Sequence, residues 1–302
     1  MILFAALTLG AAVAPLMWLA RARFALSGDW LAASAAAVSI TGCALLMGNW
    51  TLLSVHLRPL VAIAVIPALV LSRHRTTHLP AEVSTPPASR RRLLVQSAIA
   101  CAFAILFVNA LTGRVAPRGT VDLRFPLEGG AYGVIQGGSS LALNPFHRWF
   151  RSDKYALDLV KLLPSGNRAR GAAPSDLNAY ASFNEAVRSP CEGTVEAIRN
   201  DVPDNSPGDT DSQRRTGNHV FLRCGELRVL MAHLVRGSVT VSAGDAVRSG
   251  QLLGRVGNSG YTSEPHLHIG AMLARSSGWP DAEPAAVTFG GRFLAVNDVV
   301  KR

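Results

Sequence analysis

The chain has 302 residues, of which 49% are hydrophobic, and it carries 30 basic against 20 acidic residues. The charges are unevenly distributed: residues 1–113 hold eight Lys or Arg and two acids within long apolar runs, whereas residues 114–302 have the charge content of a soluble domain. The net positive charge therefore belongs partly to a membrane segment. Without interleaved aromatic and basic residues, it predicts no nucleic-acid partner.

Four apolar runs in the first 113 residues predict a membrane anchor of four α-helices. A helix needs about 20 predominantly apolar residues to cross a bilayer. The predicted spans cover about 2–20, 30–50, 54–72 and 93–111, and the first favours an uncleaved span over a signal peptide. A helical soluble core is the alternative, but four apolar runs with correctly signed loops argue against it.

Basic residues between the apolar runs predict how the anchor is oriented. They are Arg21, Arg23, Arg73, Arg75, Arg90, Arg91 and Arg92. Loops rich in Lys and Arg stay cytoplasmic, so the short third run must also cross, with Arg58 snorkelling to the outer interface. Both termini then lie on the periplasmic or extracytoplasmic side of the inner (cytoplasmic) membrane, and residues 80–89 form a short cytoplasmic loop.

The second half of the chain predicts a linker at 114–124 and a mainly antiparallel all-β domain at 125–302. Short β-rich runs are cut by Gly, Pro, Asn and Ser, as in β-sandwich domains. Strands are expected at 154–160, 219–224, 227–234, 239–247 and 250–256 and at the His-Leu-His motif, and a turn entering a strand is expected at 186–198. The polar stretch 162–183 is typical of an inserted surface loop, and the sequence leaves open whether it covers a binding groove.

Two cysteines of the second half are predicted to form a disulfide. If the strands at 186–198 and 219–224 pair across the polar loop with Ile198 opposite Gly217, Cys191 lies opposite Cys224. An extracytoplasmic compartment would oxidise this pair. Two buried thiols are the alternative. The other two cysteines lie within predicted spans, where we expect them to be packing residues.

Histidines and one aspartate are the candidates for chemistry. His266 and His268 are separated by one residue, so a strand points both imidazoles to the same face, where they can bind a metal or accept a proton. Asp158 lies on a predicted strand with His147 upstream. A buried carboxylate is costly unless it is paired or metal-bound, so Asp158 is either a metal ligand or a residue facing the surface.

An ordered set of short motifs resembles the lysostaphin/LytM-type zinc peptidases of family M23. The set spans roughly residues 186–270 and is far more specific than any one piece. The matching residues are Gly193-Thr194-Val195, Asn218-His219-Val220, Ala232-His233-Leu234, Gly244-Asp245-x-Val247, Gly250-Gln251-x-x-Gly254, Gly257-Asn258-Ser259-Gly260 and Pro265-His266-Leu267-His268.

The resemblance implies a β-sandwich-like domain that holds one Zn²⁺ through a His, an Asp and the second His of His-x-His. It makes His268 a metal ligand, and it makes His233 and His266 catalytic. His147 and Asp158 are expected to complete the ligand set, although ten residues separate them where the family usually has His-x-x-x-Asp. His56, His74 and His78 belong to the predicted anchor, and His219 is expected to have a structural or substrate-wall role.

The function implied is that of a membrane-anchored zinc metalloendopeptidase that hydrolyses peptide cross-links of peptidoglycan in cell-wall remodelling. Its partners would be the peptide stems, the lipid bilayer and a regulatory protein of unknown identity. Three ligands leave one zinc position open for water, and one of the two catalytic histidines would accept its proton. Two alternatives stay open: an inactive M23-like binding domain that regulates other wall hydrolases, and a cytoplasmic phosphocarrier domain, which the predicted topology opposes.

Overall fold

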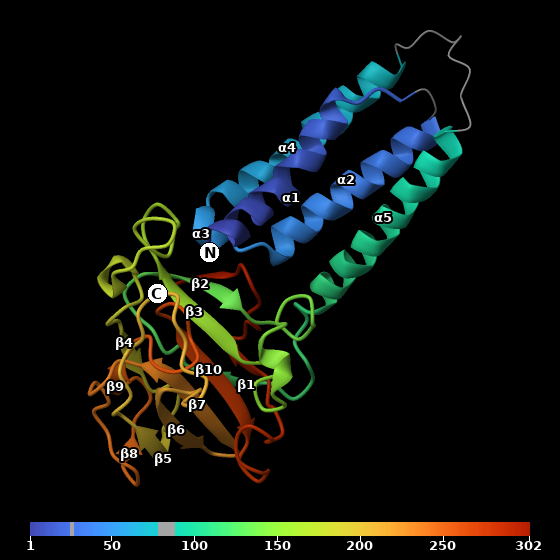
Figure 1. The fold of residues 1–302 in the computed structure, drawn as a ribbon. Coiled ribbons are helices and arrows are strands. Elements are labelled where there is room, and N and C mark those ends of the chain that lie inside the picture. Colours follow the sequence, from blue (N-terminus) through green and yellow to red (C-terminus); the bar gives the residue numbers. More distant parts are fainter. Residues whose placement is uncertain (25–26, 78–87) are drawn as a thin grey trace. The chain divides into compact units, whose positions relative to one another are not determined.

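The computed structural model describes residues 1–24, 27–77 and 88–302. These residues form two compact units, which we call the helical unit (residues 1–111) and the β unit (residues 112–302) (Figure 1). Most of the predicted cytoplasmic loop at 80–89 lies outside the described residues, and its last two residues belong to a helix. Each unit is described by itself below.

The helical unit contains the predicted spans. Its elements are α1 (Ile2–Arg21), α2 (Ser27–Met47), α3 (Trp50–Leu53), α4 (Leu57–Thr77) and α5 (Ala88–Thr112). Among the described residues, α1, α2, α4 and α5 are long and apolar enough to cross a membrane, which confirms the four predicted helices. The third of these spans, α4, begins at Leu57 and not at residue 54, because a turn separates it from the short helix α3.

Small and weakly polar side chains join the helices of this unit. The Thr41 hydroxyl of α2 donates to the Ala12 carbonyl of α1 at 3.2 Å, and the Trp30 indole donates to Ser72 of α4 at 3.1 Å. Cys43 is buried and donates to the Phe103 carbonyl of α5 at 3.2 Å. Such contacts suit helices in lipid, where close packing and interhelical hydrogen bonds replace the hydrophobic effect.

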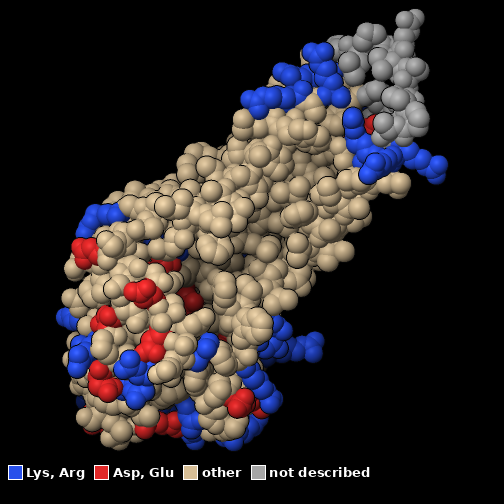
Figure 2. All heavy atoms as spheres, viewed as in Figure 1, with Lys and Arg blue, Asp and Glu red and all other residues tan. Residues whose placement is uncertain are grey.

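Among the described residues of the helical unit, most charged side chains gather at one end, and Arg58 in the first turn of α4 is an exception. Figure 2 shows Lys and Arg around the helix ends that lead to the grey residues, and an almost uncharged surface along the helices. By sequence these ends carry Arg21 on α1, Arg73 and Arg75 on α4, and Arg90 on α5. A band of apolar surface with basic residues at one end is the pattern of a membrane bundle.

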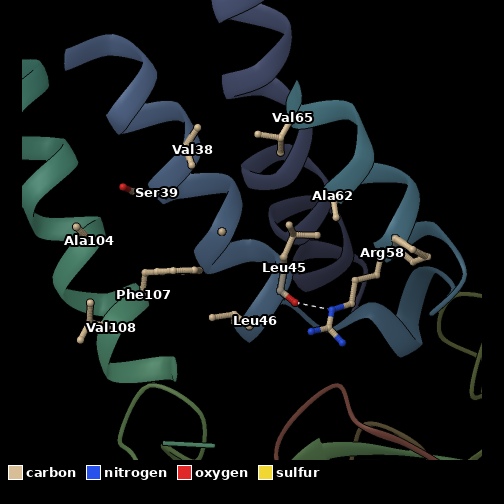
Figure 3. Close-up of a pocket in the computed structure, with 12 residues that line it drawn as sticks. Val38, Ser39, Leu45, Leu46, Arg58, Ala62, Val65, Ala104, Phe107 and Val108 are labelled. Atoms are coloured by element: carbon tan, nitrogen blue, oxygen red, sulfur yellow. Dashed lines mark hydrogen bonds between the residues drawn. The ribbon is translucent and has the colours of Figure 1, made fainter. Parts of the chain in front are cut away.

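A pocket of about 650 Å³ lies between α2, α4 and α5 (Figure 3). Its lining is largely apolar, and the Arg58 guanidinium at its edge donates through Nε to the Leu45 carbonyl at 2.7 Å. Gly42 allows α5 to approach α2, since an added Cβ would lie 2.8 Å from the Phe107 ring. None of the candidate site residues lines this pocket.

The β unit, all of whose residues are described, is built on an eight-stranded antiparallel sheet in the order β12-β2-β3-β10-β7-β6-β5-β8. This agrees with the predicted mainly antiparallel fold. The strands are β1 (Val121–Leu123), β2 (Ala131–Gln136), β3 (Leu157–Leu162), β4 (Ala186–Arg188), β5 (Gly193–Arg199), β6 (Asn218–Cys224), β7 (Leu227–Leu234), β8 (Ala246–Val247), β9 (Leu252–Arg255), β10 (Leu267–Leu273), β11 (Val287–Phe289) and β12 (Val299–Lys301). Two short helices, η1 (His147–Trp149) and η2 (Leu177–Ala179), lie in the connections.

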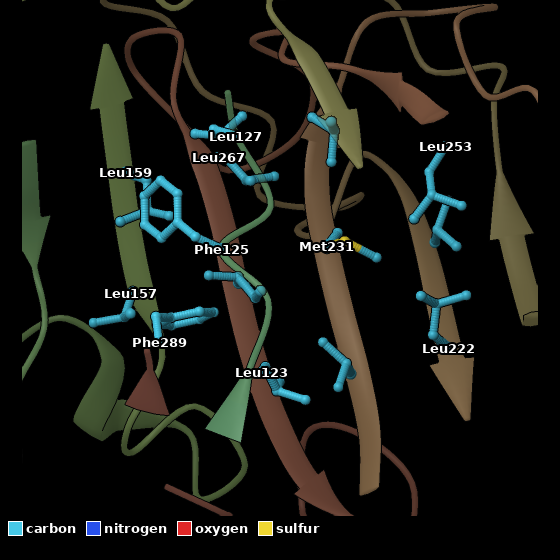
Figure 4. Close-up of a cluster of buried hydrophobic side chains, with 14 of the residues drawn as sticks. Leu123, Phe125, Leu127, Leu157, Leu159, Leu222, Met231, Leu253, Leu267 and Phe289 are labelled. Atoms are coloured by element: carbon cyan, nitrogen blue, oxygen red, sulfur yellow. The ribbon is translucent and has the colours of Figure 1, made fainter. Parts of the chain in front are cut away.

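One face of the sheet carries the hydrophobic core. Leu157 and Leu159 of β3 and Leu267 of β10 point to this face, and the segment with Phe125 and β11 with Phe289 cover it (Figure 4). The two phenylalanine rings meet edge to face, with centroids 5.6 Å apart. Each such buried side chain contributes roughly 1.5–3 kcal/mol to folding. Because side chains alternate along a strand, the residues between these leucines emerge on the opposite face.

Several strands differ from their predicted extents. The stretch at 186–198 contains the expected turn and the strand β5 after it, but also the short strand β4 before the turn, where Pro190 lacks the N–H that a continuing strand would need. The run at 239–247 contributes only the two residues of β8, since a turn with Gly244 at a φ of 94° precedes it. Glycine tolerates this left-handed conformation, whereas a side chain would be strained there.

Cys191 and Cys224 form the predicted disulfide, with their Cα atoms 5.9 Å apart. The strand register expected for it is wrong. Ile198 pairs with Val220 and not with Gly217, and a β-bulge between Val195 and Ala197 accounts for one residue of this difference. Cys191 lies in the turn before β5, where the backbone is free to bring it to the end of β6.

Candidate metal centre

The pairing of β3 with β10 brings Asp158 directly opposite His268. Their neighbours Leu159 and Leu267 enter the core, so both polar side chains emerge on the other face of the sheet. Asp158 is 8% exposed, and the alternative of a surface-facing aspartate is therefore wrong. A carboxylate with so little water around it needs positive charge or hydrogen-bond donors nearby.

His147 joins this pair from η1. Its Nε2 lies 3.2 Å from Asp158 Oδ1, and His268 Nδ1 lies 3.0 Å from the same oxygen. The three ligand atoms all lie within 4.8 Å of one another, and all three residues are buried. The structure thus brings together the three residues predicted as ligands, although they come from separate parts of the chain.

The donor set fits a zinc ion. His147 Nδ1 lies 3.1 Å from the Ala156 carbonyl, which can only accept, so Nδ1 carries a proton and Nε2, which faces Asp158, is the nitrogen that could bind a metal. Ligand atoms about 2.0–2.1 Å from a tetrahedral zinc are about 3.3 Å apart. The 3.2 Å and 3.0 Å separations around Asp158 match that spacing. Two imidazoles and one carboxylate are also ligands that zinc prefers.

His266 lies beside the three residues, just before β10. Its Nε2 is 3.4 Å from Asp158 Oδ1, and its Nδ1 faces the Glu264 carbonyl at 2.9 Å and the Thr262 hydroxyl at 3.1 Å. Because the carbonyl must accept, Nδ1 carries the proton and Nε2 is directed to the cluster. The imidazole is thereby held in one orientation and one tautomer.

His233 completes the group at the end of β7. Its ring centroid is 4.9 Å from that of His266 and 5.8 Å from that of His268, and its Nδ1 donates to the Ser259 carbonyl at 2.8 Å. The residue has a φ of 64°, a left-handed conformation that is uncommon for a side chain other than glycine. Backbone hydrogen bonds on both sides hold it, from His233 N to Thr216 O and from Gly257 N to His233 O.

The shared burial sets the charges of this group. Burial and the two neighbouring imidazoles hold the pKa of His233 well below its usual value. Burial opposes ionisation of Asp158, but His147 and His266 outweigh it, and the carboxyl pKa is well below its usual value. At neutral pH the centre therefore contains a neutral His233 beside an ionised Asp158.

Asp153 is a residue of the centre that the sequence analysis missed. Its carboxylate is buried, lies 3.9 Å from His268 Nε2, and accepts from the Trp279 indole at 3.1 Å and 3.0 Å. It therefore faces the ring nitrogen of His268 that is turned away from Asp158. The sequence carries no local signal for this contact, because Asp153 and Trp279 are 126 positions apart.

Arg168 and Glu264 form a second buried ionic contact near the centre. The Arg168 Nη2 and Glu264 Oε1 atoms are 2.6 Å apart, and the two side chains are 4% and 9% exposed. Burial raises the pKa of Glu264 despite the guanidinium. Arg168 belongs to the 162–183 stretch, so the prediction that this stretch is purely a surface loop is wrong. Its contact with Glu264 anchors it beside the residues that orient His266.

His219 lies outside the metal cluster, as the sequence led us to expect. Its Nδ1 contacts the Gly217 carbonyl at 2.9 Å, and its ring packs edge to face on Phe221 with centroids 5.2 Å apart. These contacts are consistent with a structural role on β6.

Comparison with protein families gives one match. Residues 176–278 match the family described as Peptidase family M23. The chain carries an M23 domain. The match includes His233, His266 and His268, whereas His147 and Asp158 precede it. Comparison with curated proteins gave no match.

Solved structures similar to this chain include M23 peptidases. The SpoIIQ–SpoIIIAH pore-forming complex is 19% identical, with 42% of this chain and 65% of that chain covered and a TM-score of 0.27. Lysostaphin, the antimicrobial peptidase from Staphylococcus simulans, is 17% identical over 54% and 47%, with a TM-score of 0.29. A zinc-containing peptidase from Vibrio cholerae is 18% identical over 39% and 46%, with a TM-score of 0.25. The chain spans less than two thirds of each.

Proposed function

We propose that the chain is a membrane-anchored zinc metalloendopeptidase that hydrolyses the peptide cross-links of peptidoglycan during cell-wall remodelling. The observation that carries the proposal is the convergence of His147, Asp158 and His268 on one buried point, with His233 and His266 beside them. This group lies in a chain with an M23 domain, which supports a peptidase of the cell wall over other zinc hydrolases.

His147 Nε2, Asp158 Oδ1 and His268 Nδ1 would hold the metal. Zinc supplies a Lewis acid that polarises a peptide carbonyl and acidifies water. The protein's part is to keep these three atoms together and dry, and to fix the tautomer of His147 through the Ala156 carbonyl. The charge of Asp153, 3.9 Å from the His268 nitrogen that would not be bound, would favour the tautomer with the proton on that nitrogen.

His233 and His266 would move protons and hold charge during hydrolysis. Each donates from Nδ1 to a backbone carbonyl, which leaves Nε2 as the reactive nitrogen. One of them, with Nε2 unprotonated, accepts a proton from the attacking water, and the other, with both ring nitrogens protonated, donates from Nε2 to the oxygen of the scissile carbonyl as charge develops on it. His233 at the end of β7 and His266 in the segment before β10 come from two different elements, which would allow them to face a peptide from two sides.

The helical unit would keep this domain close to its substrate. Four helices that are long enough to span a bilayer support membrane association. We propose that the β unit lies on the periplasmic or equivalent side of the cytoplasmic membrane. Basic residues at one end of the helices and a disulfide in the β unit support this orientation, because basic loops stay inside and disulfides persist outside.

Digestion of purified sacculi by the full-length protein in detergent tests the function. We expect zinc-loaded protein to release peptide fragments whose masses identify the bond that is cleaved, and a chelator to stop the release. His74→Ala, which changes a histidine of α4, is the matched control and is expected to digest as the wild type does. A protein that binds one zinc but releases nothing would instead be an inactive domain that regulates other wall hydrolases.

A further inference from the structure

Arg215 is held against two aromatic rings in the β unit. Its guanidinium carbon lies 4.4 Å from the centroid of the Tyr261 ring and 4.5 Å from that of the Phe150 ring. The planar guanidinium stacks well on such rings, and each contact is attractive because the ring face is negative. The contacts hold the half-buried side chain in place, and its N–H groups lie in the plane of the guanidinium.

No described residue accepts a hydrogen bond from the Arg215 guanidinium, nor does any form an ion pair with it. The adjacent Arg214 is different, since its Nε lies 2.7 Å from Asp211 Oδ2. Two consecutive arginines are therefore used in different ways. Arg214 is neutralised within its own loop, whereas Arg215 is positioned by rings that leave its fork of donors available. Such a fork matches the two oxygens of a carboxylate.

Arg215 lies where the loops of the metal centre meet. On one side, its carbonyl accepts from Tyr261 N at 2.8 Å, and the next carbonyl, that of Thr216, accepts from His233 N at 3.2 Å. On the other side, Phe150 is the residue that directly follows η1, the short helix that begins with His147. The guanidinium thus joins the loop before His266, through Tyr261, to the segment that begins with His147, through Phe150.

We infer that Arg215 binds a free carboxylate of the peptide substrate and thereby selects acidic stem peptides. The inference rests on the proposed function and adds the chemistry of the substrate to it. A peptide that presents its scissile carbonyl to the centre passes over the rim, where the carboxylate of a neighbouring residue or of the chain end meets the guanidinium. The bidentate contact holds the peptide in place and does not take part in bond cleavage.

The test compares one synthetic cross-linked stem peptide in three forms: with all carboxylates free, with the terminal carboxylate amidated, and with the internal carboxylates amidated. For the zinc-loaded full-length protein we expect kcat/KM to fall about 10- to 100-fold for the form that lacks the bound carboxylate, mostly through KM. Arg215→Met should lower kcat/KM for the free form by the same factor and remove the discrimination. Arg215→Lys, which keeps the charge and loses the fork, should retain part of it.

Arg214→Met is the matched control and is expected to discriminate as the wild type does. Equal cleavage of all three forms by the wild type would overturn the inference, as would an Arg215→Met protein that loses activity equally on all of them. Binding of the same three peptides to the zinc-loaded His266→Ala protein is measured in parallel. If the wild type cleaves nothing, the proposed function fails, and these binding constants still decide whether Arg215 selects a carboxylate.

Discussion

Two buried ionic clusters of the β unit are built in opposite ways. In the first, Asp158 Oδ1 faces His147 Nε2 at 3.2 Å and His268 Nδ1 at 3.0 Å, so that lone pairs converge on one point. In the second, the Arg168 guanidinium faces the Glu264 carboxylate at 2.6 Å, so that donors meet acceptors. The two lie close along the chain, since Glu264 precedes His268 by four residues.

The difference distinguishes a cluster that can bind a metal from an ion pair that stabilises the fold. A guanidinium and a carboxylate neutralise each other, and removing either leaves the other as a buried charge without compensation. Two neutral imidazoles and a carboxylate offer acceptors without matching donors, so the arrangement is stabilised by a cation. Zinc binding should therefore stabilise the first cluster. The loss of stability on mutating the second cluster should be the same with or without zinc. Each prediction below tests one side of this comparison.

The largest effect is expected from His268→Ala. The substitution removes one of three ligands, and we expect zinc to be lost from the full-length protein and hydrolysis to fall by about 10⁴-fold, since the Lewis acid contributes several kcal/mol. Zinc content by elemental analysis and release of fragments from sacculi are measured on the same preparation. Zinc-free His268→Ala protein that still hydrolysed its substrate would remove the basis of the first cluster.

His266→Ala is expected to have the next largest effect and a different signature. His266 lies beside the ligands without being one of the three convergent atoms, so the variant should bind zinc as the wild type does. Its kcat should fall by about 10²- to 10⁴-fold, which is the usual contribution of a general acid or base. Loss of zinc in parallel with activity would instead show that His266 is a metal ligand, and the ligand set would then have to include it.

The second cluster is tested by Glu264→Gln, which removes the carboxylate charge that faces the buried Arg168 guanidinium. We expect the free energy of opening of residues 163–183 to fall by about 3–5 kcal/mol, whether or not zinc is present. Hydrogen exchange of the amides in this segment measures it in the full-length protein. The double variant Arg168→Met/Glu264→Gln should lose clearly less than Arg168→Met and Glu264→Gln added together. Strict additivity would mean that the two residues act independently.

Part of this arrangement was readable from the sequence. Hydropathy is a local property, so the runs that form α1 and α2 could be located within a few residues. The period of two along a strand likewise separates Asp158 from the leucines on either side of it. The ordered motifs identified the domain, because short fixed spacings survive when the rest of the sequence changes.

The remainder depends on contacts between distant residues. The polar stretch at 162–183 has the composition of an exposed loop, and nothing local shows that Arg168 will find Glu264, 96 positions later. The bulge in β5 shifts the register with β6, but no glycine or proline at that point in the sequence indicates a bulge. Asp153 resembles any loop aspartate until Trp279 is folded against it. Long-range pairing of polar groups is thus the information that composition and periodicity lack.

Asp153→Asn is expected to have the smallest effect and to define the boundary of the first cluster. If Nδ1 of His268 binds the metal, its Nε2 carries a proton that faces Asp153 at 3.9 Å, and the negative charge of the carboxylate strengthens the ligand electrostatically. The amide keeps the shape and can still accept from Trp279, but it removes the charge. We expect zinc affinity to fall about 10- to 100-fold, as for other partners of metal-bound histidines.

Competition with a chelator of known affinity measures this loss directly and does not require activity. Asp281→Asn is the matched control, because Asp281 is an exposed carboxylate two residues from Trp279 and should not affect zinc. An Asp153→Asn protein with unchanged zinc affinity would show that the cluster ends at its three ligands. Asp153 would then belong with Glu264, as a buried carboxylate whose partner, here the Trp279 indole, holds the fold together and leaves the metal unaffected.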